Sequence, residues 1–252
     1  MNEPVLSIIR TFEGTLLLLA VLIPFLWIRE QLSKKLLSLL YRITRDARRA
    51  HQIHFIFVFP GVLIHELSHY LMLRLLSVPC TLHVGVEMQD DFVIYGHVDY
   101  YENHITPVKQ FLSGIAPLIS GIVLVSLLAV QWMGIPPIHA LANQQEVIEA
   151  ASILAAAKGF LFWFAFYLIF AITSEIVPSS ADRKYWYPFI FILLALLLLS
   201  YLTQTLGWFL NTAYPYLDNW FKVISFVFLI GLAAQVLLLL PVSLLGLLRR
   251  KR

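Results

Sequence analysis

The chain has 252 residues, of which 60% are hydrophobic and 13% are charged, and its mean hydropathy is +0.79. Soluble domains carry about 25% charged residues, so this composition excludes a soluble globular protein and indicates an integral membrane protein. The net charge of +3 comes largely from two basic segments, which we interpret as orientation signals rather than nucleic-acid contacts, and the lone Cys80 excludes an internal disulfide framework.

Six apolar segments are long enough to cross a bilayer, whose hydrocarbon core takes about 20 residues of helix. They are Pro4–Ile28, Ile53–Pro79, Pro107–Met133, Ala151–Pro178, Trp186–Leu210 and Trp220–Leu248. The first has no small-residue cleavage site after LLLLAVLIPFLWI, so we expect a retained anchor rather than a signal peptide. The sequence therefore predicts an all-α polytopic membrane protein with about six transmembrane helices, five or six of which cross.

A basic segment, REQLSKKLLSLLYRITRDARRAHQ, joins the first two apolar segments. Its apolar residues recur at helical spacing while its lysines and arginines occupy other faces. This pattern is typical of an amphipathic helix at the membrane interface. A solvated connector with incidental leucines is the alternative.

The period of the sequence changes from helical to two after the second apolar segment. TLHVGVEM and FVIYGHVDYY both alternate, and QDD between them can make a turn. This pattern predicts a small β-hairpin between the second and third transmembrane helices. Because an open sheet edge cannot face lipid, the hairpin must lie at the membrane surface or in a protein-lined cavity.

The second apolar segment carries the motif HELSH, in which His65, Glu66 and His69 interrupt a membrane span. Each ionisable side chain costs about 2.5–3.5 kcal/mol or more at the centre of a span, so such residues are functional candidates. His65 and His69 lie four positions apart and share one helix face, where two imidazoles can bind one zinc ion. Glu66 can then act as general base on a zinc-bound water, whose pKa zinc lowers to about 7.

A catalytic zinc ion has three protein ligands, so a third must come from elsewhere in the chain. We expect Asp182, in SEIVPSSADRKYW, because the second and fourth spans are parallel and end at the same membrane face. Zn²⁺ with the Asp182 and Glu66 carboxylates also sums to zero charge, which lowers the cost of burial. Glu175 is the rival third ligand. Further histidines in loops or in the hairpin are His83, His97, His104 and His139.

Three segments, in this order, resemble the site-2 protease family of intramembrane zinc metalloproteases, and together they span Phe55–Asp182, about half of the chain. HELSH resembles the zinc-binding helix of that family. YGHVDYYENHITPVKQFLSGIAPLISG is similar to its strand-then-helix segment, with Ala116-Pro117 in place of Gly-Pro. SEIVPSSAD resembles the third-ligand motif, in which Ser174 takes the position of the usual Asn and Arg183 that of the usual Gly.

The resemblance implies one bound Zn²⁺ with Glu66 as the general base. The implied zinc ligands are His65, His69 and Asp182. Substrate binding or oxyanion stabilisation, with which the family's Asn would help, would fall to Ser174, Ser179 or Ser180. The resemblance also favours an active site toward the cytosol.

We predict an intramembrane zinc endopeptidase that hydrolyses a peptide bond in or near a transmembrane segment of another membrane protein, as in regulated intramembrane proteolysis. Its partners would be that substrate and the lipid bilayer, with no nucleic acid, in a bacterial or archaeal cell membrane. We divide the chain into an anchor with the basic amphipathic helix (1–52), a catalytic core of three spans and the hairpin (53–185), and two C-terminal transmembrane helices (186–252).

Three alternatives share parts of this pattern. ZIP-type metal transporters carry an HExxH-like helix, but they pair it with further ligands on a neighbouring span, and no HNxxD occurs here. A catalytically inactive scaffold of the same fold would agree with Ser174 and Arg183, although the intact Glu66 argues against it. A di-iron membrane oxygenase would need several further histidine pairs.

Overall fold

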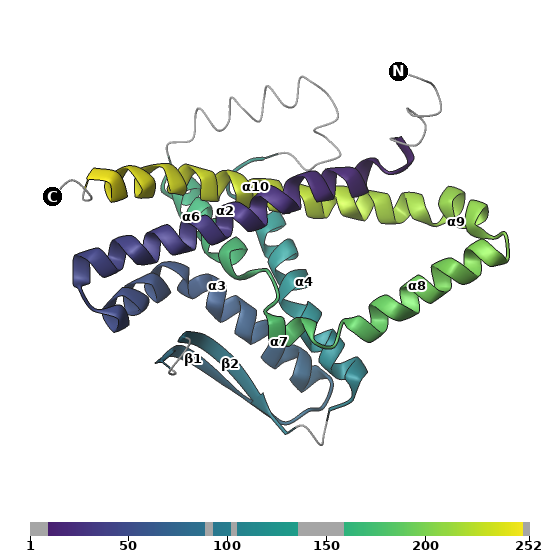
Figure 1. The fold of residues 1–252 in the computed structure, drawn as a ribbon, viewed down its shortest axis with the longest axis horizontal. Helices are drawn as coiled ribbons and strands as arrows, with labels where there is room; N and C mark the ends of the chain where they lie inside the picture. The colour runs from purple at the N-terminus through teal and green to yellow at the C-terminus, as the bar shows by residue number, and fades with distance from the viewer. Residues whose placement is uncertain (1–9, 89–92, 102–104, 136–158, 249–252) are drawn as a thin grey trace.

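The computed structural model describes residues 10–88, 93–101, 105–135 and 159–248 (Figure 1). The helices are α2 (Glu13–Thr44), α3 (Ala47–Leu75), α4 (Pro107–Gln131), α6 (Phe160–Glu175), α7 (Ser180–Arg183), α8 (Tyr187–Leu202), α9 (Leu206–Thr212) and α10 (Tyr214–Leu248). The strands β1 (Cys80–Met88) and β2 (Val93–Tyr100) pair antiparallel. The predicted helical membrane fold with one β-hairpin is confirmed.

Four helices, α2, α3, α4 and α10, are long and apolar enough to cross a membrane. The pair α8 and α9 becomes a fifth if it counts as one span, although it bends by 113°. Helix α6 is apolar but has only 16 residues, and the start of the predicted fourth span, residues 151–158, lies outside the described residues. The described residues therefore account for four or five of the roughly six predicted spans.

Helix α2 joins two segments that the sequence predicts as separate. The anchor and the basic segment as far as Thr44 form one helix of 32 residues, which at about 1.5 Å per residue is longer than the hydrocarbon core of about 30 Å. The helix ends at Arg45, which has a positive φ of 53°. Asp46 then caps α3 by accepting a hydrogen bond from the Arg49 backbone N–H at 3.1 Å. The expectation of a separate interfacial helix is corrected, because the break comes at Arg45 and Asp46, within the basic segment.

Helices α2 and α10 lie side by side along one edge of the molecule (Figure 1). The Asp218 carboxylate of α10 accepts hydrogen bonds from the backbone N–H groups of Gly14 at 2.8 Å and Thr15 at 3.3 Å. The residue preceding α2 supplies no side-chain cap. Asp218 therefore provides, from another helix, the hydrogen-bond acceptor for the unpaired N–H groups at the start of α2. Further along, Phe25 packs on Phe228 with ring centroids 4.9 Å apart.

Helix α3 packs closely against α6 at the centre of the core. A Cβ atom placed on Gly61 of α3 would collide with the backbone carbonyl of Ala171 in α6, so the two backbones touch there. Small residues permit this close approach between membrane helices. The contact sets α3, which carries HELSH, directly beside the helix that leads to Asp182.

The hairpin lies across α3 (Figure 1). Its strands pair from Cys80 with Tyr100 to Met88 with Val93, and a register shift between Val84 and Glu87 interrupts the strict alternation that the sequence predicts. The predicted QDD turn lies outside the described residues. Tyr95 anchors the hairpin, because its hydroxyl hydrogen-bonds to Nδ1 of two α3 histidines, His51 at 2.9 Å and His54 at 3.0 Å.

Candidate metal centre

Two helices bring together three side chains of the types that can bind a metal ion. His65 and His69 project from one face of α3, one turn apart. Helix α6 ends at Glu175, and the chain turns through Pro178 into the short helix α7, which carries Asp182. A Cβ atom on Gly114 of α4 would lie 2.6 Å from the Asp182 backbone oxygen, so a glycine there lets α7 approach α4. The predicted third ligand therefore reaches the histidine pair.

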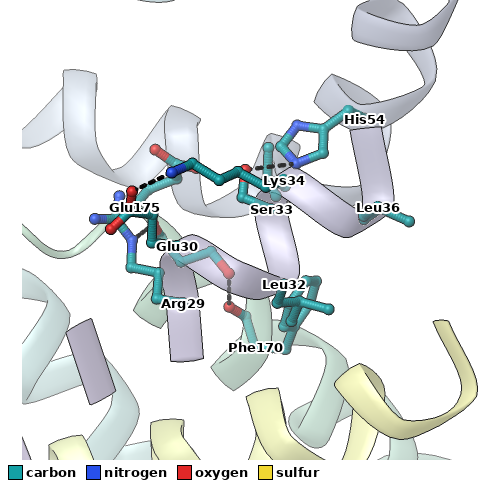
Figure 2. Close-up of a pocket in the computed structure, with 11 residues that line it drawn as sticks. Arg29, Glu30, Leu32, Ser33, Lys34, Leu36, His54, Phe170 and Glu175 are labelled. Atoms are coloured by element: carbon teal, nitrogen blue, oxygen red, sulfur yellow. Dashed lines mark hydrogen bonds and ion pairs between the residues drawn. The ribbon is translucent and has the colours of Figure 1, made fainter. Parts of the chain in front are cut away.

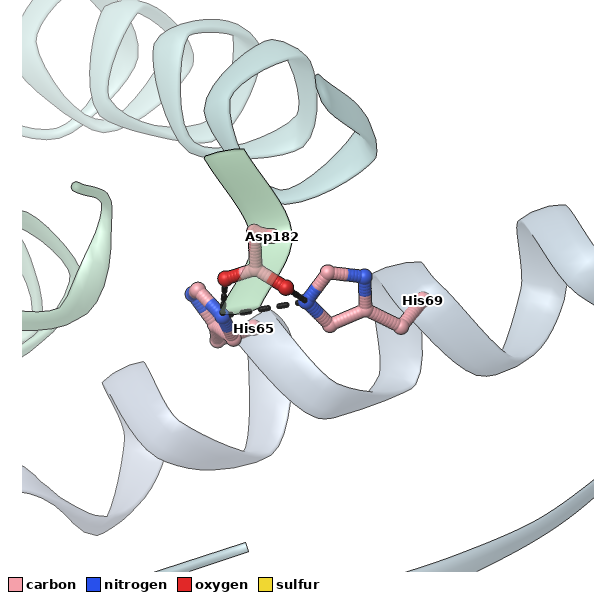
Figure 3. A group of neighbouring side chains, drawn as sticks. All are labelled: His65, His69 and Asp182. Atoms are coloured by element: carbon pink, nitrogen blue, oxygen red, sulfur yellow. Dashed lines mark hydrogen bonds and ion pairs between the residues drawn. The ribbon is translucent and has the colours of Figure 1, made fainter. Parts of the chain in front are cut away.

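The ligand atoms of this group converge on one point (Figure 3). The two Nε2 atoms of His65 and His69 lie 3.1 Å apart. Oδ1 of Asp182 lies 3.2 Å from Nε2 of His69, and Oδ2 of Asp182 lies 3.7 Å from Nε2 of His65. Ligand atoms about 2.0–2.2 Å from a tetrahedral zinc ion lie roughly 3.3–3.6 Å from one another. The carboxylate thus reaches each ring with a different oxygen, at a distance close to that value.

Backbone carbonyls set the tautomer of both rings. Nδ1 of His65 lies 2.7 Å from the carbonyl oxygen of Glu175, and Nδ1 of His69 lies 2.9 Å from that of Ser113. A carbonyl oxygen can only accept, so each Nδ1 donates and each neutral ring keeps its lone pair on Nε2. Metal-binding histidines are commonly held in this way through the second nitrogen.

A cation satisfies this arrangement better than the side chains satisfy one another. Two Nε2 lone pairs and a carboxylate meet in a space where the side chains of His65, His69 and Asp182 are 12%, 11% and 15% exposed. Acceptors that converge without a donor repel each other in a weakly solvated site. A proton on one ring would relieve one contact, whereas a metal ion would relieve all three. The residues therefore fit a zinc ion.

Asp182 is itself held in place within α7. Its carboxylate accepts a hydrogen bond from the Ser179 backbone N–H at 2.7 Å, and its own N–H donates to the Ser179 hydroxyl at 3.2 Å. Burial acts to raise the pKa of the Asp182 carboxyl, but the nearby His65 and His69 rings and the hydrogen bond from Ser179 outweigh burial and lower the pKa to about 2. Asp182 is thus a carboxylate at neutral pH, the form that binds a metal.

Glu66 faces the same cavity as the three candidate ligands. This cavity, of about 630 Å³, lies between α3, α4, α7 and the hairpin. A Cβ atom on Gly96 of β2 would lie 2.6 Å from Cγ of Glu66, so the hairpin packs directly on this carboxylate. Ser179 and Ser180 also line the cavity. The structure thus gathers the predicted base, ligands and two of the three predicted serines around one space.

Ser174 and Glu175 are not members of the group that His65, His69 and Asp182 form. The Ser174 hydroxyl donates to the Phe170 carbonyl in its own helix, at 2.8 Å. Ser174 lines a neighbouring cavity of about 260 Å³, together with Arg29 and Glu175 (Figure 2). Glu175, the rival ligand, contacts the ring of His65 through its backbone carbonyl. Of the four further histidines considered as ligands, His83 and His97 lie on the hairpin. His104 and His139 lie outside the described residues.

The sequence analysis misses Arg29 as a neighbour of the site. Arg29 of α2 donates from Nε to the carbonyl of Ser174, and it lines a cavity of about 510 Å³ with His65 and Glu66. A basic residue directly after an apolar run is normally an orientation signal, so nothing local distinguishes Arg29. The carbonyls that hold the histidine rings have no sequence signal either.

Comparison with known proteins does not place the chain in a family: no protein-family model, no curated protein and no solved structure matches it.

Proposed function

We propose that the chain is an intramembrane zinc metalloendopeptidase with His65, His69 and Asp182 as zinc ligands. The observation that carries the proposal is the convergence of these three side chains from α3 and α7, with both imidazoles held by backbone carbonyls. Glu66 completes the set by facing the same cavity. The proposal also draws on the resemblance to the site-2 protease family.

Each of the chain's own residues has a separate task in this proposal. A bound zinc ion would supply Lewis acidity toward a substrate carbonyl and water. Glu66 would accept the proton of the attacking water and return it to the leaving amine. Ser179 and Ser180, which line the cavity, would hold the substrate backbone beside Glu66. The tight packing of Gly96 against Glu66 would keep this carboxylate in position for both proton transfers.

The substrate would be a transmembrane helix of another protein that unwinds locally on entering the cavity. The hairpin wall supports this proposal, because Val93, Ile94, Gly96 and Val98 of β2 line the cavity. An extended peptide can add to a strand through backbone hydrogen bonds. A helix would not offer those groups, since its backbone is already paired internally.

The proposal is tested by comparing the membrane-protein fragments produced by wild type and by Glu66→Gln. We expect Glu66→Gln to retain zinc and to lose about 10²–10⁴-fold in cleavage rate, as the loss of a general base does. Glu87→Gln is the matched control, because Glu87 is an exposed glutamate on β1 and the change removes the same charge.

Equal fragment patterns from wild type and Glu66→Gln would overturn the proposed mechanism. Zinc flux into proteoliposomes that depends on His65 and His69 would instead assign the chain to metal transport.

A further inference from the structure

The hairpin carries a second group of metal-binding side chains. His83 of β1 and His97 of β2 are direct partners across the two strands. Asp99 follows His97 by two positions, so the alternation of a strand places it on the same face. Ligand atoms of His83, His97 and Asp99 all lie within 4.8 Å of one another.

The hairpin cluster offers three ligand atoms that are close enough to share one cation. The two imidazole rings are nearly parallel, at 16°, with centroids 5.0 Å apart. Both Nε2 atoms approach the same Asp99 oxygen, His83 at 3.5 Å and His97 at 3.6 Å. These distances equal the separation of roughly 3.3–3.6 Å between ligand atoms of a tetrahedral zinc ion.

The hairpin cluster is separate from the candidate metal centre, although the two are neighbours. Gly96 presents its Cα hydrogens to Glu66, so by strand alternation His97 and Asp99 point from the other side of β2. The side chains of His83, His97 and Asp99 are 49%, 33% and 67% exposed, so ions from solvent can reach them. Of the three, His97 also borders the cavity, which puts the cluster at its rim.

We propose that His83, His97 and Asp99 form a second site for a divalent d-block cation, of the Zn²⁺, Ni²⁺ or Cu²⁺ class, which binds more weakly than the candidate metal centre. Two imidazole nitrogens and one carboxylate oxygen select this class over Mg²⁺ and Ca²⁺, which prefer oxygen ligands. The bound cation would join β1 to β2 and stabilise the strand that forms the wall of the cavity beside Glu66. The proposal does not depend on peptidase activity.

Zinc binding by the purified full-length protein tests this proposal, with Zn²⁺ alone as the probe. In a His69→Ala background, which removes the candidate metal centre, we expect one Zn²⁺ to remain bound. His83→Ala or His97→Ala in that background should weaken binding by at least about tenfold, the lower end of the loss caused by removing even an outer partner of a metal ligand. Thr81→Ala is the matched control, since Thr81 is the cross-strand partner of Asp99 and is no ligand.

Equal zinc affinities for the His83→Ala and Thr81→Ala variants would overturn the proposal, as would the absence of zinc binding at millimolar Zn²⁺ in the His69→Ala background. A second measurement uses an intact candidate metal centre. Zn²⁺ above one equivalent should slow amide exchange in Cys80–Met88 and Val93–Tyr100 of wild type but not of His83→Ala. Identical exchange in both proteins would also overturn the proposal.

Discussion

The candidate metal centre and the hairpin cluster hold the same three residue types, two histidines and one aspartate, in different surroundings. In the centre, the side chains are 11–15% exposed and each ring is fixed by a backbone carbonyl. In the cluster, the side chains are 33–67% exposed and the rings stack on one another. The ligand types are therefore alike, while the support around them is not.

Under the proposed function, support from the fold, rather than the types of ligand, would distinguish the catalytic metal site from the accessory one. A ring that is already oriented loses little freedom when it binds a metal, whereas an exposed ring must be ordered first. Glu66 lines one cavity with all three residues of the centre, whereas His97 is the one residue of the cluster that borders this cavity.

The largest effect is expected from the two ligand aspartates. Asp182→Ala should weaken the tighter zinc by more than about 100-fold, because it removes a buried, pre-oriented ligand. Asp99→Ala should leave that zinc unchanged and weaken only the second one. Zinc affinities measured by chelator competition check both variants. If Asp182→Ala holds zinc as tightly as wild type, Asp182 is not a zinc ligand.

Gly96 should matter for turnover and Gly85 should not, although both lie on the hairpin. A methyl group on Gly96 displaces Glu66, and a shift of about 1 Å in a catalytic group can cost about 100-fold in rate. Gly85→Ala meets nothing within 4 Å and serves as the control. The measurement is the rate at which each variant produces the membrane-protein fragments that are absent with Glu66→Gln. Zinc content should be unchanged in both variants. Equal turnover would show that the hairpin does not position Glu66.

Gly114 should be needed for the centre and for the stability of the fold around it. Gly114→Ala forces a methyl group onto the Asp182 backbone carbonyl, and overpacking of this kind costs about 1–3 kcal/mol. Gly207→Ala, on the open helix α9, should instead be neutral or stabilising by up to about 1 kcal/mol. Thermal unfolding in detergent measures both. The same sign for the two changes would contradict a tight approach of α7 to α4.

The smallest effect is expected from Ser113→Ala. The ring of His69 contacts the Ser113 carbonyl at 2.9 Å and its hydroxyl only at 3.4 Å, so the substitution keeps the better contact. Zinc affinity should fall by less than about tenfold. A larger loss would mean that the hydroxyl, rather than the backbone, orients the ring.

Local sequence patterns predicted the hairpin and the shared face of His65 and His69 correctly, because strand alternation and helical spacing are set within a few residues. The approach of Asp182 was predicted because the second and fourth spans should run parallel and end at the same membrane face. In the structure, Asp182 of α7 does lie beside His65 and His69 of α3. The prediction of a separate helix in the basic segment was wrong for a local reason. The stop signal is the Asp46 cap together with Arg45, and it lies near the end of that segment rather than at its start.

The role of Ser174 could not be decided from its position in the motif. Its spacing from Asp182 agrees with the resemblance, yet its hydroxyl bonds back to its own helix. A serine hydroxyl in a helix can always reach the carbonyl oxygen four residues earlier. Packing around the serine decides whether that hydrogen bond forms. Arg29 shows the reverse case, since a distant helix brings it to the cavity without any local signal.

Sequence alone was enough to predict a multi-pass membrane protein with ionisable side chains at helical spacing inside a span and a hairpin beside it. These properties follow from composition and from short-range periodicity, which lipid and backbone geometry enforce. The choice of ring nitrogen that stays free on His65 and His69, and the place of Arg29 beside the cavity, came from the three-dimensional structure alone. Those outcomes depend on backbone carbonyls and on glycine contacts between helices far apart in the chain, and neither has a local pattern.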